Sequence, residues 1–473
     1  MRVVNPATGE LISTVVDDTP ATIAEKVAVA RAAQPAWAAR SIGERIEIVR
    51  AFRQLVVERH DELAATLTAE TGKPITQSHN ELNGLLPRVD FFVEEAERTL
   101  ADEVVLDDAD GAIREVIAHE PLGVIANISA WNYPYFVGSN VFVPALLAGN
   151  AVLYKPSEHA TLTGLAIASM LGDAGVPAAV FAVAAGDGQA GAELLSHGLD
   201  GVFFTGSYGT GRHIAESVAS TLTRVQLELG GKDPVYVADD VDVAVAAEGL
   251  ADGAFYNNGQ SCCSVERIYV HRSVHDEFVE RFVATVDGFR LGDPTDPATY
   301  LGPLTRAAQL RVLEAQVADA VARGAVVRTG GQQVDGQRVD GQRVDGEQVD
   351  GEQVVAWFAP TVLTGVTSAM EVMREESFGP IIGIQAVDDD GEAVALMNDT
   401  DYGLTAGVYS ADEARARAIL EQVHAGSVYW NCCDRVSPRL PWSGRGHSGL
   451  GSTLSTYGIH TFVQPKAWHL RRP

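Results

Sequence analysis

The chain carries a cysteine directly after a flexible turn. Cys262 ends the run Asn-Gly-Gln-Ser-Cys at 258–262 and is followed by a second cysteine, Cys263. A thiolate exposed at such a bend can act as a nucleophile. Most free cysteines are instead buried core thiols, and taken alone Cys262 fits that description better. Its surroundings in the sequence therefore have to decide between the two.

A carboxylate interrupts an otherwise apolar run at 225–232, which reads Val-Gln-Leu-Glu-Leu-Gly-Gly-Lys. At the end of a buried strand, Glu228 would lose part of its hydration. That loss raises the pKa of a carboxyl group toward the value that suits a general base. A surface glutamate on an edge strand is the alternative, but the flanking leucines and the two glycines argue against it.

Two weaker motifs accompany these residues. The run Thr-Gly-Ser-Tyr-Gly-Thr-Gly at 205–211 would let phosphates approach backbone N–H groups at a helix N-terminus, although it is not GxGxxG and has no Walker lysine. Asn132, in Trp-Asn-Tyr-Pro at 131–134, could donate an amide N–H to a developing oxyanion. Taken alone, a turn residue before proline is the better interpretation of Asn132.

The elements that must position these residues alternate between strand and helix. The first hundred residues predict helices over 22–57, 61–71 and 81–101, where apolar residues recur at helical spacing. After residue 121, strands are predicted at 124–128, 151–154, 180–184, 201–205 and 225–229, separated by helices at 138–148, 162–171, 188–196 and 211–220. This alternation indicates an α/β fold with a parallel, doubly wound sheet, whose ligands bind at the carboxyl ends of the strands.

A second alternating region, 235–428, could be another α/β domain. Within it, 332–355 repeats Val-Asp-Gly every five residues and lacks a packable face, so we expect a low-complexity surface insert. Calcium-binding repeats have a different spacing. The segments 112–120 and 458–470 are short and β-prone, and could be edge strands used for assembly.

Composition excludes several classes of protein. The net charge of −28, from 63 acidic and 35 basic residues, argues against a nucleic-acid partner. Neither a signal peptide nor an apolar stretch long enough to span a bilayer is visible, so no membrane association is expected. The four cysteines form two adjacent pairs, without a disulfide framework or CxxC metal spacing. We therefore expect a reducing, cytoplasmic location and no metal site.

Taken in this order, the motifs resemble the aldehyde dehydrogenase superfamily, in its non-acylating, NAD(P)-dependent form. The resemblance runs from Asn-Pro-Ala-Thr-Gly at 5–9 to Gln-Pro-Lys at 464–466. Its most specific parts are Leu-Glu-Leu-Gly-Gly-Lys at 227–232, Gly-Gln-Ser-Cys at 259–262 and Glu-Glu-Ser-Phe-Gly-Pro at 375–380. It implies a Rossmann-type cofactor domain, an α/β catalytic domain and a small β oligomerisation arm.

The resemblance assigns a role to each central residue. Cys262 would attack the aldehyde as a thiolate, and the Asn132 side chain with the Cys262 backbone N–H would hold the oxyanion. Loss of hydride to NAD would leave a thioester on Cys262. Glu228 would then activate water to release the carboxylic acid. This agrees with the chemistry, because a thiohemiacetal can donate hydride and a thioester needs a base for its hydrolysis.

The resemblance also assigns cofactor and domain residues. Glu158 would bind the adenosine ribose beside Lys155 and favour NAD over NADP, unless it only caps a helix. The expected cofactor-binding residues are Trp131, Lys155, Glu158, Gly206, Ser207, Gly211, Glu376 and Phe378. The expected domains are an NAD-binding domain at 1–111 and 121–229, a catalytic domain at 230–428, and an arm at 112–120 and 455–473. Such an arm implies a homodimer or homotetramer.

The substrate is expected to be a medium aliphatic or aromatic aldehyde, because the positions that should line the tunnel are mainly apolar. These are Tyr133, Val137, Asn140, Ser261, Cys263, Val436 and Trp442. A semialdehyde held through its carboxylate by Arg435 or Arg439 is the alternative, although these arginines are better explained as facing solvent. The chain also departs from the family pattern at Val141, where many members carry a lysine.

Two further interpretations compete. In a CoA-acylating dehydrogenase, CoA would resolve the thioester, but such an enzyme would not need Glu228 as a base. A non-catalytic, dehydrogenase-like binding protein would not need Cys262, Glu228 and Asn132 together. The joint presence of these three residues therefore favours the hydrolytic enzyme.

Overall fold

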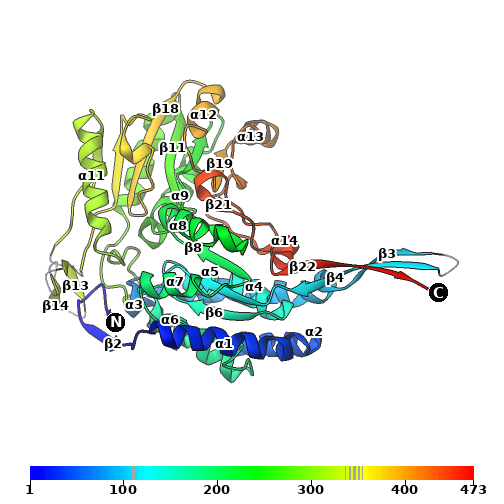
Figure 1. Ribbon diagram of the computed structural model, residues 1–473. Helices are drawn as coiled ribbons and strands as arrows, with labels where there is room; N and C mark the ends of the chain where they lie inside the picture. The colour runs from blue at the N-terminus through cyan, green and yellow to red at the C-terminus, as the bar shows by residue number, and fades with distance from the viewer. Residues whose placement is uncertain are drawn as a thin grey trace.

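Two large sheets and a projecting β arm make up the protein (Figure 1). The computed structural model describes residues 1–108, 112–335, 337–339, 342–344, 348–349, 352–353 and 355–472, and for the four short segments between 337 and 353 it describes the backbone alone. The prediction that the side chains of the repeat insert face solvent lies outside the described residues. The backbone of the insert pairs as β13 (Gln337–Val339) with β14 (Gln342–Val344), and as β15 (Gln348–Val349) with β16 (Glu352–Gln353).

The first sheet has the strand order β21-β9-β8-β5-β6-β7. Its strands are β5 (Val124–Ile128), β6 (Ala151–Lys155), β7 (Phe181–Val183), β8 (Gly201–Thr205), β9 (Arg224–Glu228) and β21 (Gly449–Leu450). The five strands predicted from the sequence are all present and parallel, within one or two residues of the predicted bounds. The sixth strand, β21, pairs antiparallel to β9, so Glu228 does not lie at the sheet edge.

Helices from the first half of the chain pack with this sheet into one core. They are α1 (Pro20–Ala38), α2 (Ile42–Glu58), α3 (His60–Thr71), α4 (Ile75–Leu100), α5 (Pro134–Ala148), α6 (Thr161–Asp173), α7 (Gly188–Leu195) and α8 (Tyr208–Val218). The helical stretch predicted over 22–57 is present as two helices, because the chain breaks before Ser41. The Ser41 hydroxyl accepts from the Glu44 N–H and the Glu44 carboxylate accepts from the Ser41 N–H, a capping box that starts a new helix.

The second sheet has the order β12-β17-β18-β11-β10-β19-β20. Its strands are β10 (Asp233–Val237), β11 (Val265–His271), β12 (Val326–Thr329), β17 (Thr361–Thr364), β18 (Ile381–Val387), β19 (Thr405–Tyr409) and β20 (Ser427–Trp430). Alternate residues of β10 face opposite cores, as strand geometry requires. Val235 and Val237 pack with α9 (Val243–Phe255) and α10 (His275–Asp287), whereas Tyr236 packs with α11 (Gln309–Ala322), α12 (Asp390–Met397) and α13 (Glu413–Leu420).

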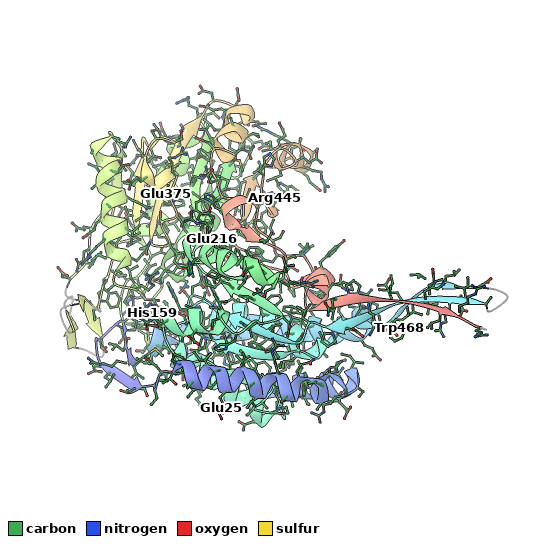
Figure 2. All side chains as sticks on the ribbon, viewed as in Figure 1. Glu25, His159, Glu216, Glu375, Arg445 and Trp468 are labelled. Atoms are coloured by element: carbon green, nitrogen blue, oxygen red, sulfur yellow. The ribbon has the colours of Figure 1, made fainter. Side chains whose placement is uncertain are left out.

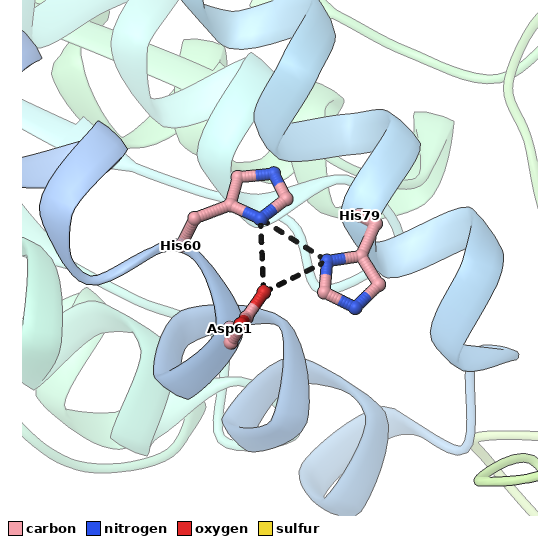
Figure 3. Close-up of side chains that lie close together, drawn as sticks. All are labelled: His60, Asp61 and His79. Carbon is pink, nitrogen blue, oxygen red and sulfur yellow. Dashed lines mark hydrogen bonds and ion pairs between the residues drawn. The ribbon is translucent and has the colours of Figure 1, made fainter.

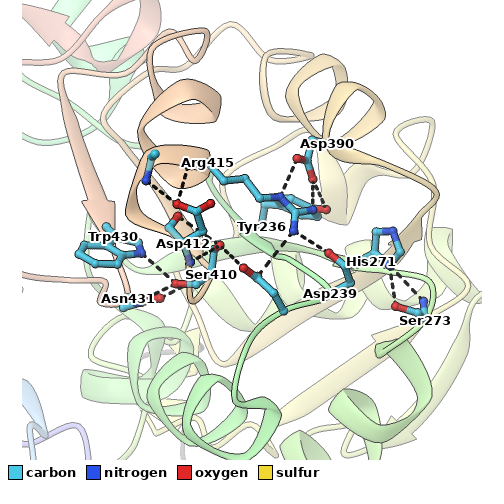
Figure 4. A network of polar contacts seen from close by, with 12 residues as sticks. Tyr236, Asp239, His271, Ser273, Asp390, Ser410, Asp412, Arg415, Trp430 and Asn431 are labelled. Carbon is cyan, nitrogen blue, oxygen red and sulfur yellow. Dashed lines mark hydrogen bonds and ion pairs between the residues drawn. The ribbon is translucent and has the colours of Figure 1, made fainter.

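A polar network fixes the outer strands of the second sheet (Figure 4). Arg415 of α13 donates to both carboxylate oxygens of Asp390, at 2.8 and 2.6 Å, and to Asp239 at 2.7 Å. Asn431 exchanges two hydrogen bonds with the backbone of Ser410 and adopts a left-handed φ of 53°. This turn sends the segment after β20 back toward the middle of the molecule.

The arm is a three-stranded antiparallel sheet that extends away from both large sheets (Figures 1 and 2). It consists of β3 (Glu103–Asp107), β4 (Ile113–Pro121) and β22 (Val463–Arg471). The predicted strand 112–120 corresponds to β4, but the prediction over 458–470 is wrong in its first part. That part is the end of helix α14 (Ser455–His460), and only the residues from Val463 onward form a strand.

The remaining two strands pair near the N-terminus, β1 (Arg2–Val4) with β2 (Leu11–Thr14). Among the described residues, no helix combines the length and apolar character needed to cross a membrane.

Candidate active site

Two cavities of about 740 and 730 Å³ meet at the carboxyl ends of the first sheet's strands. Cys262 and Glu228 each line both cavities. Among the described residues, no other nucleophile or base lines both. Asn132 lines the first cavity. The structure thus brings together three side chains that are far apart in the sequence.

A sharp turn presents Cys262 to both cavities. Three consecutive residues, Asn257, Asn258 and Gly259, have positive φ values of 53°, 58° and 65°. Only glycine fits the third position, because a Cβ there would lie 2.4 Å from the carbonyl oxygen of Gly379. Beyond the turn, Cys262 is only partly buried. The backbone therefore holds the thiol where two ligands can reach it.

Asn132 directly precedes α5 and is held by a buried ion pair. The Lys73 ammonium donates to the Asn132 carbonyl oxygen at 2.7 Å and to the Glu81 carboxylate. Glu81 in turn accepts from the Tyr135 N–H at 2.9 Å. Within the described part of the chain the Asn132 side-chain amide has no hydrogen-bond partner, so it can donate into the cavity. Sequence reasoning missed Lys73, which lies between α3 and α4, and Glu81 of α4, because only the fold brings them to Asn132.

Glu228 ends β9 as a buried carboxylate. It accepts hydrogen bonds from the Thr453 hydroxyl and, at 3.4 Å, from the Thr205 hydroxyl. Burial raises the pKa of Glu228 above its ordinary value, although the Thr453 hydrogen bond and the charge of Arg88 oppose the shift. The group is therefore poised to accept a proton more readily than an exposed glutamate.

The first cavity contains nearly all of the residues predicted to bind a cofactor. These are Trp131, Lys155, Glu158, Gly206, Ser207, Glu376 and Phe378. Gly211 is the exception, since it does not line the cavity. It lies one turn inside α8, where a Cβ would come within 2.5 Å of the Leu229 side chain. Gly211 therefore allows close packing of helix against strand.

The shape and polarity of the first cavity fit an elongated phosphate-bearing ligand. The α8 N-terminus opens into it through Ser207, Gly209 and Thr210, and a Cβ on Gly209 would meet open space. Helix N-termini favour phosphate. At another wall, Lys155 lies 3.7 Å from Glu158. Burial opposes ionisation of Glu158, yet a backbone hydrogen bond and the Lys155 charge hold its pKa below the ordinary value.

A second buried ion pair shapes the wall that carries Glu376 and Phe378. The Lys232 ammonium lies 2.6 Å from the Glu266 carboxylate, which accepts from the Phe378 N–H at 3.0 Å. This holds Phe378 at a positive φ of 45°, with its ring 5.5 Å from that of Trp131. Burial raises the pKa of Glu376 to about 8, and a Cβ on Gly230 would lie 2.3 Å from its carboxylate. The side chain of His159, labelled in Figure 2, contacts Trp131 from the other side.

The second cavity is lined by all seven residues predicted to contact a substrate: Tyr133, Val137, Asn140, Ser261, Cys263, Val436 and Trp442. Charged residues that sequence reasoning missed line it as well, among them Arg88 and Asp434. The cavity is therefore more polar than the sequence predicted. Arg88 lies within a helix and Asp434 beside two cysteines, so no local motif pointed to either.

Arg88 is a buried cation. Its guanidinium donates to the Asn140 side-chain oxygen at 3.0 Å and lies 4.1 Å over the Phe136 ring. Among the described residues, no carboxylate is within 4 Å of it. Burial lowers the pKa of Arg88 to about 10, while the charges of Glu228 and other groups in the cavity wall act in the opposite direction. The guanidinium therefore keeps donors available for an oxygen-bearing ligand.

Asp434 is a half-buried acceptor on the opposite segment. It accepts from the Cys263 thiol at 2.8 Å, and burial raises its pKa to about 6. The hydrogen bond with Cys262, followed by burial, raises the pKa of Cys263. Cys263 is therefore a neutral thiol in the cavity wall.

The remaining candidates of this region lie nearer to solvent. Arg435 is exposed at the edge of the second cavity, whereas Arg439 does not line it. Cys432 and Cys433 are only partly buried and line the same cavity. Burial raises the pKa of Cys433 to about 12, so this thiol stays protonated at neutral pH.

Comparison with known proteins places the chain among relatives of similar length. A family model described as the aldehyde dehydrogenase family matches residues 1–468. A 3,6-anhydro-alpha-L-galactose dehydrogenase of Streptomyces coelicolor is 38% identical over 477 residues, covering 100% of this chain and 93% of the relative. A 3-sulfolactaldehyde dehydrogenase of Pseudomonas putida is 34% identical over 466 residues, covering 98% of this chain and 92% of the relative.

Solved structures share the fold throughout. An NADP-dependent enzyme of E. coli superimposes with a TM-score of 0.92 at 32% identity, covering 100% of this chain and 94% of that one. PnpE in complex with nicotinamide adenine dinucleotide superimposes with a TM-score of 0.92 at 33% identity, with the same coverage of 100% and 94%. The neighbours therefore include proteins that use either dinucleotide.

Proposed function

The chain belongs to the aldehyde dehydrogenase family and is an oxidoreductase that acts on aldehydes, and from this premise we propose that it oxidises its aldehyde to the carboxylic acid through a thioester on Cys262. The observation that carries the proposal is the junction of the two cavities. Cys262 and Glu228 line both of them. A nucleophile placed there can hold the substrate carbon between a cofactor on one side and an aldehyde pocket on the other.

Each residue at the junction has one task. The Cys262 thiolate adds to the carbonyl carbon, and the Asn132 amide with the Cys262 N–H donates to the resulting oxyanion. NAD(P), when bound in the first cavity, supplies the acceptor for the hydride that leaves this carbon with its electron pair. Glu228 then takes a proton from water as the water attacks the thioester; the C–S bond breaks, which releases the acid and returns Cys262 as the thiolate.

We assign cofactor binding to the first cavity and propose NAD as the preferred form. The Glu158 carboxylate suits a ribose 2′-OH and repels a 2′-phosphate. Arg306 lines the same cavity, and its charge contributes to lowering the pKa of Glu158. The cavity therefore also contains a cation that could bind a 2′-phosphate. The five parallel strands of the six-stranded sheet, with their helices, lie within 1–111 and 121–229 and would form the cofactor domain, to which β21 adds a sixth strand from 449–450. The seven-stranded sheet, which lies within 230–428 except for the last two residues of β20, would form the catalytic domain.

The substrate that fits the second cavity best is a short aldehyde with oxygen substituents. Arg88 can donate to a hydroxyl, carboxylate or sulfonate oxygen, and Asp434 can accept from a hydroxyl. We propose it in place of a medium aliphatic or aromatic aldehyde, because a purely apolar substrate would use neither the Arg88 donors that Asn140 leaves over nor the second oxygen of Asp434. Two sequence relatives whose names specify an anhydrogalactose and a sulfolactaldehyde support this choice, whereas relatives of 34–35% identity are named as betaine aldehyde dehydrogenases.

A cofactor-reduction assay tests the proposed function. Purified protein would be given NAD or NADP with aliphatic, aromatic, hydroxylated and anionic aldehydes, and reduced cofactor followed by absorbance. We expect NAD to be reduced faster than NADP, and hydroxylated or anionic aldehydes to be preferred. Absence of any reduction across the panel would instead favour the non-catalytic binding protein.

Replacing Arg88 by methionine should separate substrate selection from chemistry. We expect kcat/KM for an anionic or hydroxylated aldehyde to fall about 30-fold or more, the size expected when one partner of a buried charged contact is removed. An unsubstituted aldehyde of equal length should be affected far less. The matched control is Arg435→Met, which removes an exposed arginine at the same cavity. Equal losses for both kinds of aldehyde would mean that Arg88 does not select the substrate.

We propose that the arm joins copies of the chain into a homodimer or homotetramer. Val105 is 56% exposed and Leu470 46% exposed on its strands, and Trp468 (Figure 2) is 44% exposed. Clustered exposed apolar side chains mark association surfaces. The double variant Val105→Lys/Leu470→Lys should therefore lower the mass measured by light scattering, at least by half. Leu440→Lys, at an exposed leucine elsewhere, should leave the mass unchanged.

A further inference from the structure

Two histidines and an aspartate meet on the surface formed by α3 and α4 (Figure 3). None of the three lines either of the two cavities described above. His60 and Asp61 begin α3, and His79 lies in the first turns of α4. The two Nδ1 atoms are 3.2 Å apart. The Asp61 carboxylate oxygen lies 3.5 Å from Nδ1 of His60 and 3.9 Å from Nδ1 of His79.

These separations are close to those of a metal coordination shell. Ligand atoms about 2.0–2.1 Å from a tetrahedral zinc ion lie roughly 3.3–3.4 Å from one another. Two imidazole nitrogens and one carboxylate oxygen are donors that zinc accepts, with water completing the shell. From these contacts we propose that His60, Asp61 and His79 bind a divalent metal ion of the zinc type.

A comparison of α3 with α10 shows which part of this site does not follow from the local sequence. Both α3 and α10 begin with the sequence His-Asp-Glu, and in α10 the His275 Nδ1 lies 2.9 Å from the Asp276 carboxylate. A histidine beside an aspartate therefore follows from the local sequence alone. Only at α3, among the described residues, does another helix add a second imidazole.

The surrounding charges favour a cation at this place. Arg59, the nearest basic neighbour in sequence, pairs with Glu62 at 2.8 Å. Asp61 is almost fully exposed, and the whole chain carries a net charge of −28. Without a metal, the two Nδ1 atoms share a single hydrogen bond, since one must donate and the other accept. A metal ion would satisfy both, and would also link α3 to α4.

Sequence spacing predicted no metal site, because His79 lies on another helix and only the fold brings it to His60. The site is independent of the chemistry proposed for Cys262. A metal bound there would stabilise the folded state by mass action. Its effect can therefore be measured without substrate or cofactor.

Zinc titration of the chelator-treated protein by calorimetry tests the proposal. We expect the unmodified protein to bind one more equivalent of Zn²⁺ than the double variant His60→Ala/His79→Ala, and Zn²⁺ to raise the melting temperature only of the former. The control His275→Ala should match the unmodified protein. Zinc bound by cysteine thiols is common to all three proteins and cancels in the comparison.

Asp61→Asn covers the case in which the double variant folds poorly, because this side chain is too exposed to affect the core. It should weaken the additional site at least tenfold, while leaving the melting temperature without zinc unchanged. Isotherms of the unmodified protein that match those of the folded double variant would overturn the proposal, and where the double variant does not fold, a match with Asp61→Asn would overturn it.

Discussion

Cys262→Ala is expected to lower the turnover of every aldehyde by about 10⁴-fold or more, the scale of loss found when an enzyme's nucleophile is removed. The alanine has no group that can add to the carbonyl carbon, so no thiohemiacetal forms. The half-buried thiol of Cys262 also lines both cavities, and among the described residues it shares this position only with the base Glu228. No neighbouring thiol occupies that point to replace it.

The measurement is the initial rate of cofactor reduction with the best aldehyde, together with the thermal shift caused by NAD. The thermal shift should persist in Cys262→Ala, because the walls of the first cavity are otherwise intact. Cys432→Ala, at a partly buried thiol of the second cavity, is the matched control and should keep most of the turnover. If Cys262→Ala retained a tenth of the activity, the chemistry could not be assigned to this thiol.

Much of the site could be predicted because its signals are local. The parallel strands of the first sheet are short and mainly apolar, and the three central side chains lie near their ends or after a glycine turn: Asn132 after β5, Glu228 at the end of β9 and Cys262 after Gly259. Gly259 shows why such a motif carries information, since its positive φ and its approach to Gly379 allow no side chain. The order of strands then brings the ends of β5, β8 and β9 side by side.

The polar character of the second cavity could not be predicted, because it depends on tertiary contacts. Arg88 occupies a buried position of α4 that the helical pattern treats like any other, and it enters the site only because α4 packs on α5. Asp434 reaches the cavity through the turn at Asn431, which the Ser410 contacts hold. Lys73 likewise contacts Asn132 across the fold.

The same limit explains the errors in secondary structure. β21 is two residues long and is a strand only because Gly449 and Leu450 pair with Glu228 and Leu227. That pairing also brings Thr453 to the Glu228 carboxylate. An element without a periodic signal of its own thus sets the environment of the proposed base.

Glu228→Gln should separate the two halves of the proposed reaction. The glutamine fills the same space and keeps a carbonyl oxygen for the Thr453 hydroxyl, but it cannot take a proton from water. Steady-state turnover should fall about 10²–10⁴-fold, the contribution of a general base. Formation of the thioester does not use this proton transfer, so the variant should still produce a rapid burst of one reduced cofactor per site.

Rapid-mixing absorbance measures the burst, and a pH series identifies the base. Because burial raises the pKa of Glu228, the steady-state rate of the unmodified protein should fall on acidification through that raised pKa, as the carboxylate becomes protonated. The variant should lack this limb of the profile. Glu216→Gln, at an exposed glutamate of α8 (Figure 2), is the matched control and should preserve both the burst and the steady state. Loss of the burst in Glu228→Gln, with cofactor binding intact, would place the essential role of Glu228 before the thioester, in activating Cys262.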